Sequence, residues 1–295
     1  MLPLNDTEVL EIAQKANAIR QTIIEMLLAA GSGHTAGPLG MADIFAALYF
    51  RVLTHDPHNP DWTERDRLIL SNGHIVPVRY SAMAHAGYFP LEECLTLRKF
   101  GSRLQGHPEK DRLPGLETTS GPLGEGLAQA AGMAYALRMD EKKNRVYCIM
   151  GDGEQNEGSV WEALMWAAKQ RLSNLTVIID RNNIQIDGFT ETIMPLEPLA
   201  DKYRAFNWHV LEVDGHNIAQ FVAACSEAKA IYEKPTIIIA HTIPGKGIKE
   251  IENDFRWHGN PPGKGPTDKV AAADQGKVFL DELRTLQGKI TSEHQ

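Results

Sequence analysis

Residues 145–157, with the sequence RVYCIMGDGEQNE, decide the fold. The apolar run from 145 to 150 predicts a buried strand, which ends in a polar turn containing two glycines. Residues 160–170 follow with the pattern of a helix, and a second apolar run occupies 175–180. A buried strand, a helix and another buried strand form a βαβ unit, and such units imply a parallel sheet.

The same pattern continues downstream. Two more strands are expected at 208–213 and 236–240, separated by a helix near 219–231. Short apolar runs that alternate with helices in this way place helices over both faces of a sheet. The predicted fold class is therefore α/β, with a mostly parallel sheet and helices on both of its faces.

The N-terminal region is predicted to be helical. Apolar residues at spacings of three and four indicate a helix over 8–30, which Asn5 and Glu8 can cap. A loop rich in glycine follows at 31–38, and a second helix is expected at 41–51.

The C-terminal end is set apart by composition. A segment rich in Gly and Pro at 259–267 indicates a linker, and a final helix is expected at 269–286. We therefore divide the chain into one domain over residues 1–260 and a linker with a C-terminal helix over 261–295.

Composition excludes several classes of protein. The chain has 295 residues, 43% hydrophobic and 23% charged, which is ordinary for a globular protein and unlike collagen or a disordered chain. A net charge of −8 argues against a general nucleic-acid binder. The apolar runs are too short for a membrane span, and no signal peptide opens the chain. Three scattered cysteines without a CxxC pair indicate a reducing compartment, so we expect a cytoplasmic protein.

The polar turns after two predicted strands suggest a metal site. Asp152 follows the first strand between two glycines, and Asn182 follows the next. Parallel strands place such turns at one edge of the sheet. With the backbone carbonyl of Ile184, they offer three oxygen ligands of the kind that Mg²⁺ shares with a diphosphate. On spacing alone, two polar turns with Asp152 capping the next helix explain the pattern equally well.

Glycine-flanked histidines form a second signal. Such residues in loops are placed more like site residues than like core residues, and together they predict a polar pocket that holds phosphate and moves protons. For any single one, an ordinary surface or turn histidine is the alternative. The four are His34, His74, His107 and His258.

The segment 120–126, SGPLGEG, is a third signal because it runs into a predicted helix of small residues at 127–137. Helix N-terminal amides preceded by glycines can bind an anion, although tight helix packing would also explain the glycines. Two common phosphate motifs are incomplete. The GDGEQN turn lacks the third glycine of a dinucleotide fingerprint, and neither GKG sequence has the spacing of a P-loop.

Taken together, these motifs resemble the N-terminal, diphosphate-binding half of a transketolase, across about residues 8–265. The resemblance rests on six motifs in the family's order. They are Gly33-His34, Leu70-Ser-Asn-Gly-His74, Gly106-His-Pro-Glu109, Ser120–Gly126, the Gly-Asp-Gly turn with Asn182, and Gly245-Lys-Gly with Trp257-His-Gly259.

The resemblance implies thiamine diphosphate as cofactor, with Mg²⁺, or Ca²⁺ or Mn²⁺, as its metal. Asp152, Asn182 and the Ile184 carbonyl match the family's metal ligands. The positions matching cofactor contacts are His74, Gly153, Asn182 and His258, and also Gly121, Pro122 and Leu123, which match the lining of the two rings. The positions matching residues that face the sugar hydroxyls are His34, His107 and His258. Glu157 and Glu162 match acidic residues at the family's subunit interface.

Two departures from the family pattern accompany these matches. Thr35-Ala36 stands where Pro-Gly is common, and Glu125 stands where Gln or His is usual. Transketolases also continue into two further domains, one of which binds the aminopyrimidine. The chain therefore resembles the first subunit of a split transketolase, and we expect an α2β2 heterotetramer with a C-terminal-half subunit.

The function implied is transfer of a two-carbon ketol unit from a ketose phosphate to an aldose phosphate. Breaking the donor's carbon–carbon bond requires a group that takes the proton of the C3 hydroxyl, and His34 or His258 could do so. Two alternatives remain open. One is a subunit of a related enzyme similar to 1-deoxyxylulose-phosphate synthase, and the other is a regulatory subunit without catalytic activity.

Overall fold

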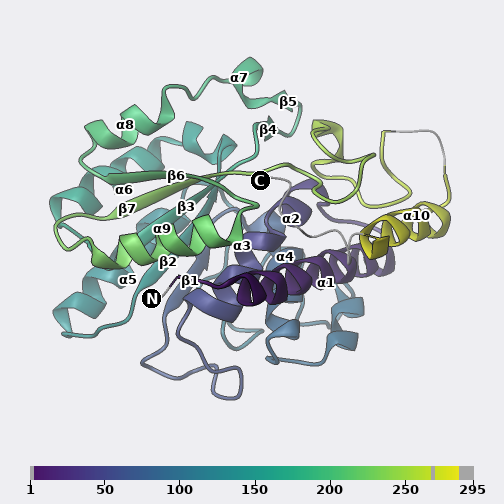
Figure 1. The fold of residues 1–295 in the computed structure, drawn as a ribbon, viewed down its shortest axis with the longest axis horizontal. Helices are drawn as coiled ribbons and strands as arrows, with labels where there is room; N and C mark the ends of the chain where they lie inside the picture. Colours follow the sequence, from purple (N-terminus) through teal and green to yellow (C-terminus); the bar gives the residue numbers. More distant parts are fainter. Residues whose placement is uncertain (1–2, 267–269, 286–295) are drawn as a thin grey trace.

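The computed structural model describes residues 3–266 and 270–285. Its centre is a five-stranded sheet in the order β1-β2-β3-β7-β6, in which every neighbouring pair is parallel (Figure 1). The strands are β1 (Arg67–Leu70), β2 (Val146–Gly151), β3 (Leu175–Arg181), β6 (His209–Asp214) and β7 (Thr236–His241). The predicted fold class is confirmed, and β1 extends the sheet beyond the four expected strands.

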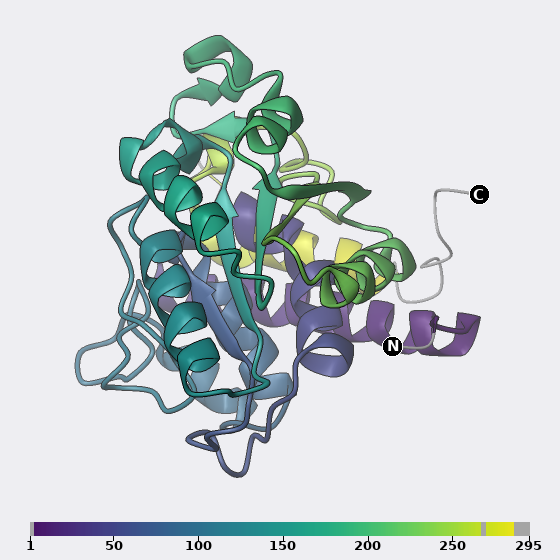
Figure 2. The ribbon, with the colours of Figure 1, turned by 90° about the vertical axis from the view of Figure 1, so that its left-hand side faces the viewer.

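Helices cover both faces of the sheet, as the edge-on view in Figure 2 shows. Alternate side chains of β2 separate into two cores. Tyr147 and Ile149 pack into one of these cores, whereas Cys148 and Met150 pack into the other. Because both faces of the strand are buried, its sequence is continuously apolar rather than alternating.

The first core lies under six helices and a π-helical turn. These are α1 (Asp6–Ala30), α2 (Ala36–Gly40), α3 (Ala42–Ala47) with the π-helix Leu48–Val52, α4 (Val76–His85), α9 (Ile218–Ala230) and α10 (Ala272–Thr285). The second core lies under α5 (Gly126–Met139), α6 (Gly158–Lys169) and α8 (Leu199–Ala205). A small hairpin of β4 (Ile184–Gln185) and β5 (Gly188–Phe189) leads into α7 (Thr190–Ile193).

The start and end of α1 follow the sequence signals. Asn5 accepts a hydrogen bond from the backbone of Glu8, and the Glu8 carboxylate accepts one from the backbone of Asn5. Gly31 ends the helix with a φ of 61°, a left-handed conformation that glycine adopts readily. The loop expected over 31–38 is shorter than predicted, because α2 begins at Ala36 with Pro38 in its first turn.

The C-terminal helix α10 packs against α1. Asn17 of α1 donates to the backbone carbonyl of Leu283 at 2.9 Å, and the Phe279 ring meets the edge of Trp257 at 5.7 Å. Residues 267–269 and 286, at the ends of the predicted linker and helix, lie outside the described residues. The division of the chain at residue 260 stays a prediction.

The three cysteines are buried and unpaired, as small core residues. None of the helices in the described ranges is both long and apolar enough to cross a bilayer.

A buried ionic cluster connects α1, α3 and the turn after β6. Arg20 of α1 donates to both carboxylate oxygens of Asp43 on α3. His216 accepts a hydrogen bond from the backbone of Ile243 at Nε2, so its Nδ1 carries the proton and donates to Asp43 at 2.7 Å. Arg20 and His216 hold the pKa of the Asp43 carboxyl well below its usual range, against the effect of burial.

Replacing Asp43 with alanine should therefore leave Arg20 buried without its counter-ion. We expect the free energy of unfolding at pH 7 to fall by about 3–5 kcal/mol, measured by urea denaturation. The matched control Asp281→Ala removes the partner of Arg284 in an exposed pair and should cost less than about 0.5 kcal/mol. Equal losses in the two variants would contradict this account.

Candidate functional site

Polar turns gather at the carboxyl edge of the sheet. Strand β1 leads into Ser71, β2 into Asp152 and β3 into Asn182, and the last two turns are joined by a hydrogen bond from the Asn183 backbone to Asp152. In open parallel sheets, ligands bind at this edge. The structure therefore brings together motifs that lie more than one hundred residues apart in the sequence.

One buried carboxylate, Glu154, joins three of these motifs. It accepts hydrogen bonds from the Ser71 hydroxyl, from the backbone of Gly124 at 2.6 Å, and from the backbone of Gly151 at 3.2 Å. Burial raises the pKa of Glu154, while these donors oppose that rise. The sequence pattern does not single out Glu154, because its donors come from loops whose proximity only the fold reveals.

Two glycines allow these loops to approach closely. A Cβ on Gly73 would lie 2.5 Å from the Ser120 hydroxyl and 3.2 Å from its carbonyl carbon. A Cβ on Gly126 would overlap Ser71, including its backbone. The glycines of both motifs are therefore required for contact between segments 70–74 and 120–126.

The Asp152 side chain is buried, and both of its carboxylate oxygens accept hydrogen bonds. Its Oδ1 accepts from the Gly153 backbone at 2.7 Å, which caps the 3₁₀ turn Gly153–Asn156. Its Oδ2 accepts from Arg181 at 3.0 Å, from the Asn183 backbone at 2.8 Å and from Thr190 at 3.2 Å. Burial outweighs these donors and raises the pKa of Asp152. Asp152 thus caps this 3₁₀ turn rather than the next α-helix, α6, which begins at Gly158, and its role as a metal ligand stays a prediction.

The second predicted ligand, Asn182, lies in the adjoining turn. Its Oδ1 accepts from the Ile184 backbone at 3.0 Å, and its Nδ2 donates to Asp180 at 3.0 Å. Burial raises the pKa of Asp180 to about 7. Arg181, which lies between Asp180 and Asn182 in the chain, forms ion pairs with Asp152 and with two glutamates of the next segment, Glu191 and Glu197. The residues next to Arg181 in the sequence do not predict its three acidic partners.

Metal binding at this edge would depend on oxygen atoms of mixed origin. Across residues 3–266 and 270–285, no group of three or more His, Cys, Asp or Glu side chains is arranged to hold a metal. The predicted set has one carboxylate, one amide and one carbonyl, and an all-oxygen set suits Mg²⁺.

Three of the four glycine-flanked histidines form one cluster. The ring centres of His34 and His74 lie 4.9 Å apart, those of His34 and His258 5.4 Å, and those of His74 and His258 5.1 Å. Burial, with repulsion from neighbouring histidines, lowers the pKa of His34 to about 3 and that of His74 well below its ordinary value. Burial alone lowers the pKa of His258. The buried Nδ1 of His34 has no hydrogen-bond partner among the described residues.

The fourth histidine, His107, lies outside this cluster of rings. It is exposed and lines a cavity of about 560 Å³ with Ser120. A Cβ on Gly121 would lie 3.9 Å from the His107 ring, so the 106–109 and 120–126 motifs are neighbours. Pro122 and Leu123 are exposed on the same loop.

The family model for the thiamine diphosphate binding domain of transketolase matches residues 12–276. This chain belongs to the transketolase family. Three relatives illustrate the match. A 6-deoxy-6-sulfo-D-fructose transketolase subunit from a Clostridium species is 46% identical, over 84% of this chain and 90% of the relative. An apulose-4-phosphate transketolase subunit from Phocaeicola vulgatus is 39% identical, over 86% and 90%. Rat transketolase is 40% identical, over 86% of this chain and 40% of the relative.

Solved transketolases share the fold. The enzyme from Leishmania mexicana superposes with a TM-score of 0.80 at 32% identity, over 95% of this chain and 46% of that one. The enzyme from Campylobacter jejuni gives 0.80 at 32%, over 95% and 48%. The chain thus spans less than half the length of these solved transketolases.

The residues at the edge fit the transketolase cofactor, thiamine diphosphate. A diphosphate needs hydrogen-bond donors and a metal, and the carboxyl edge offers imidazoles and oxygen ligands for a cation. The buried Nδ1 of His34, which has no partner among the described residues, is a further polar group that a ligand could satisfy. Gly153 faces the hairpin, where a Cβ would lie 3.1 Å from Gln185.

The buried cluster makes stability depend on pH. The unfolded chain takes up a proton on His34 near pH 6.5, whereas the folded chain does so only near pH 3. Stability therefore decreases as the pH is lowered from 6.5 to 3. In His34→Gln, the free energy of unfolding should decrease less steeply than in wild type as the pH is lowered through this range. The two slopes should differ by up to about 1.4 kcal/mol per pH unit. Urea denaturation at several pH values measures this slope. His58→Gln, which removes an exposed histidine, is the control, and equal slopes for His34→Gln and wild type would contradict the prediction.

Proposed function

We propose that this chain is the diphosphate-binding subunit of a split transketolase, which transfers a two-carbon ketol unit from a ketose phosphate to an aldose phosphate. The observation that carries the proposal is the family match together with relatives that are themselves named subunits, 90% of whose length this chain covers. The sugars named for those relatives have a sulfo or a phosphate group, which supports a sugar substrate with an anionic substituent.

Thiamine diphosphate supplies an electron sink for cleaving a carbon–carbon bond, and the protein supplies binding and orientation. We assign its diphosphate to His74, His258 and Gly153. Gly121, Pro122 and Leu123 are assigned to its rings, where the exposed Pro122 and Leu123 are free to meet a ligand or a partner. Asp152, Asn182 and the Ile184 carbonyl would hold Mg²⁺, or Ca²⁺ or Mn²⁺, beside the diphosphate.

The histidine cluster would handle substrate protons. Burial keeps His34 and His258 neutral near pH 7, so each has a ring nitrogen that can accept a proton. We assign to these nitrogens the proton of the donor's C3 hydroxyl, and to His107 a contact with the sugar hydroxyls from the cavity side.

The partner in this proposal is a C-terminal-half subunit that carries the aminopyrimidine site, in an α2β2 heterotetramer. Several exposed residues lie near the carboxyl edge, on the loop at 120–126 and on the turn after β2, including Leu123 and Glu157. Glu162, on the following helix, is exposed as well. A twofold assembly would cover these surfaces and close without leaving free interfaces.

The metal assignment predicts that Asp152→Asn weakens cofactor binding. Loss of the charged ligand should lower the affinity for thiamine diphosphate at saturating Mg²⁺ at least about tenfold, measured by titration calorimetry. The matched control Asp187→Asn removes an exposed carboxylate from the neighbouring β4–β5 hairpin and should retain wild-type affinity. Thermal unfolding of both variants checks that the fold survives. Unchanged affinity in Asp152→Asn would remove Asp152 from the metal site.

The split-enzyme proposal predicts that the chain alone is inactive. A cofactor held by one half stays largely in water, which weakens the electrostatic interactions that catalysis uses. We expect no turnover of a ketose phosphate and an aldose phosphate by the pure chain with thiamine diphosphate and Mg²⁺. Turnover should appear when the partner subunit is added. Robust activity in a preparation that mass spectrometry shows to be free of other chains would refute the proposal.

A further inference from the structure

A hydrogen bond from Thr35 links two segments of the candidate site that lie 225 residues apart in the sequence. The Thr35 hydroxyl lies 2.6 Å from the backbone carbonyl oxygen of Asn260. A carbonyl carries no proton, so the threonine is the donor and the carbonyl is the acceptor. Thr35 directly follows His34 in the chain, and its acceptor lies two residues after His258. The bond therefore joins the loops that carry two histidines of the cluster.

The Thr35 hydroxyl is available for this bond because it does not cap the helix that follows. Thr35 stands at the N-cap position of α2, where a threonine hydroxyl commonly accepts a hydrogen bond from a helix amide. Here the residue has a φ of −110° and a ψ of −50°, and its side chain accepts no bond from the amides of α2, all of which the structure describes. The side chain is fully buried. Its hydroxyl thus acts between loops and not within its own helix.

The acceptor is held in place by the segment around it. The Asn260 side chain donates to the Arg256 carbonyl at 2.8 Å. The His258 backbone donates to the Phe255 carbonyl at 2.9 Å, and the Trp257 indole is fully buried. This segment is a compact turn, in which the position of the Asn260 carbonyl is tied to that of His258.

The two loops meet at the histidine rings. The ring centres of His34 and His258 lie 5.4 Å apart, with the rings at an angle of 86°. A Cβ on Gly259 would lie 3.7 Å from Nε2 of His34, which is ordinary van der Waals contact. A substitution at Thr35 therefore tests how the rings are held together without altering either histidine.

We propose that Thr35 is a positioning residue, whose hydroxyl keeps the His34 and His258 rings together at one substrate. The inference rests on the proposed transketolase function and adds a structural requirement to it. Both histidines are assigned to the proton of the donor's C3 hydroxyl, and a displacement of about 1 Å at such a group can cost about 10²-fold in rate. The proline that is common at this position in the family pattern has no hydroxyl and can make no such bond.

The variant Thr35→Val keeps the shape of the side chain and removes its hydroxyl. The backbone bond from Gly245 to the Ala36 carbonyl, at 2.8 Å, remains, so the loop should shift rather than detach. In the complex with the partner subunit, kcat for a ketose phosphate and an aldose phosphate should fall about 5- to 50-fold, while KM changes less than about threefold. Thr35→Ser keeps the hydroxyl and should retain kcat within about threefold of wild type.

Thr22→Val is the matched control. Thr22 is also a buried threonine, and its hydroxyl lies 3.0 Å from Nε2 of His85, outside the histidine cluster. Its midpoint of thermal unfolding should fall as in Thr35→Val, by about 2–4 °C, with kcat unchanged. An equal loss of kcat in Thr22→Val would overturn the proposal, and so would a Thr35→Ser enzyme as slow as Thr35→Val. If Thr35→Val does not fold, Thr35→Ala and Thr22→Ala serve for the same comparison.

An NMR measurement keeps this inference distinct from the proposed function. In the full chain with isotope-labelled histidine, a nuclear Overhauser effect is expected between the His34 and His258 rings, whose centres lie 5.4 Å apart. The effect should persist in Thr35→Ser and in Thr22→Val, and weaken or disappear in Thr35→Val. If the complex transfers no ketol unit, the proposed function fails, and this measurement still decides whether Thr35 positions the rings. An unchanged ring contact in Thr35→Val would reject the positioning role, and so would a lost contact with wild-type kcat.

Discussion

The site depends on the buried carboxylate of Glu154. It is 1% exposed and accepts hydrogen bonds from three separate segments, at Ser71, Gly124 and Gly151. A buried charge is tolerated only when donors satisfy it, and here those donors belong to loops that carry residues assigned to the cofactor in the proposed function. The requirement to satisfy one carboxylate thus fixes the relative positions of the loop after β1, the loop before α5 and the turn after β2.

Much of the fold could be predicted from the sequence because its strands are buried on both faces. The apolar runs at 145–150, 175–180 and 236–240 each correspond to an observed strand within one residue or so. The strand β1 was missed because it has four residues and follows an irregular segment, which gives a periodicity argument little to use. The end of α1 was predictable because capping is a local interaction.

The candidate site likewise contains residues that local sequence signals identify and residues that they do not. Local signals found Asp152, Asn182 and the glycine-flanked histidines, and the structure brings His34, His74 and His258 into contact. Their neighbourhood identified them as polar loop residues but could not show that His107 stands apart. Arg181 and Glu154 were overlooked because their partners are distant in sequence or lie on other loops. Ligand roles for these residues stay proposals.

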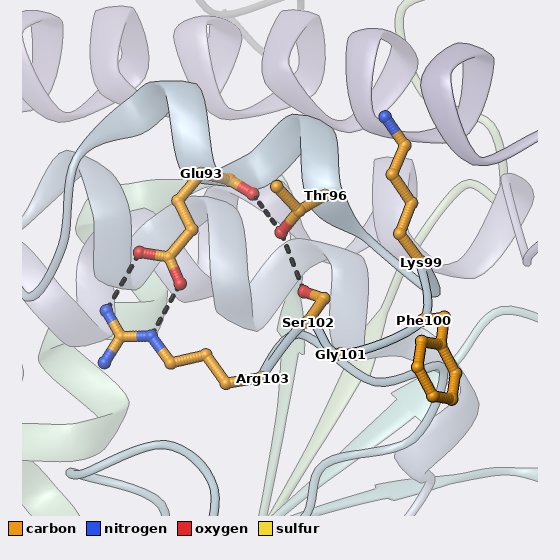
Figure 3. Close-up of a pocket in the computed structure, with 7 residues that line it drawn as sticks. All are labelled: Glu93, Thr96, Lys99, Phe100, Gly101, Ser102 and Arg103. Atoms are coloured by element: carbon orange, nitrogen blue, oxygen red, sulfur yellow. Dashed lines mark hydrogen bonds and ion pairs between the residues drawn. The ribbon is translucent and has the colours of Figure 1, made fainter.

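The loop that carries the Glu93–Arg103 ion pair (Figure 3) has a consequence for how transketolases diversify. The segment between α4 and α5 contributes no strand to the sheet, and its ion pair between Glu93 and Arg103 is internal to one loop. Substitutions of its exposed residues 98–101 leave the two cores and the Glu154 contacts untouched, whereas Leu97 and Leu104 belong to the first core. In the proposed transketolase, such substitutions would alter this surface loop without altering the residues assigned to the cofactor.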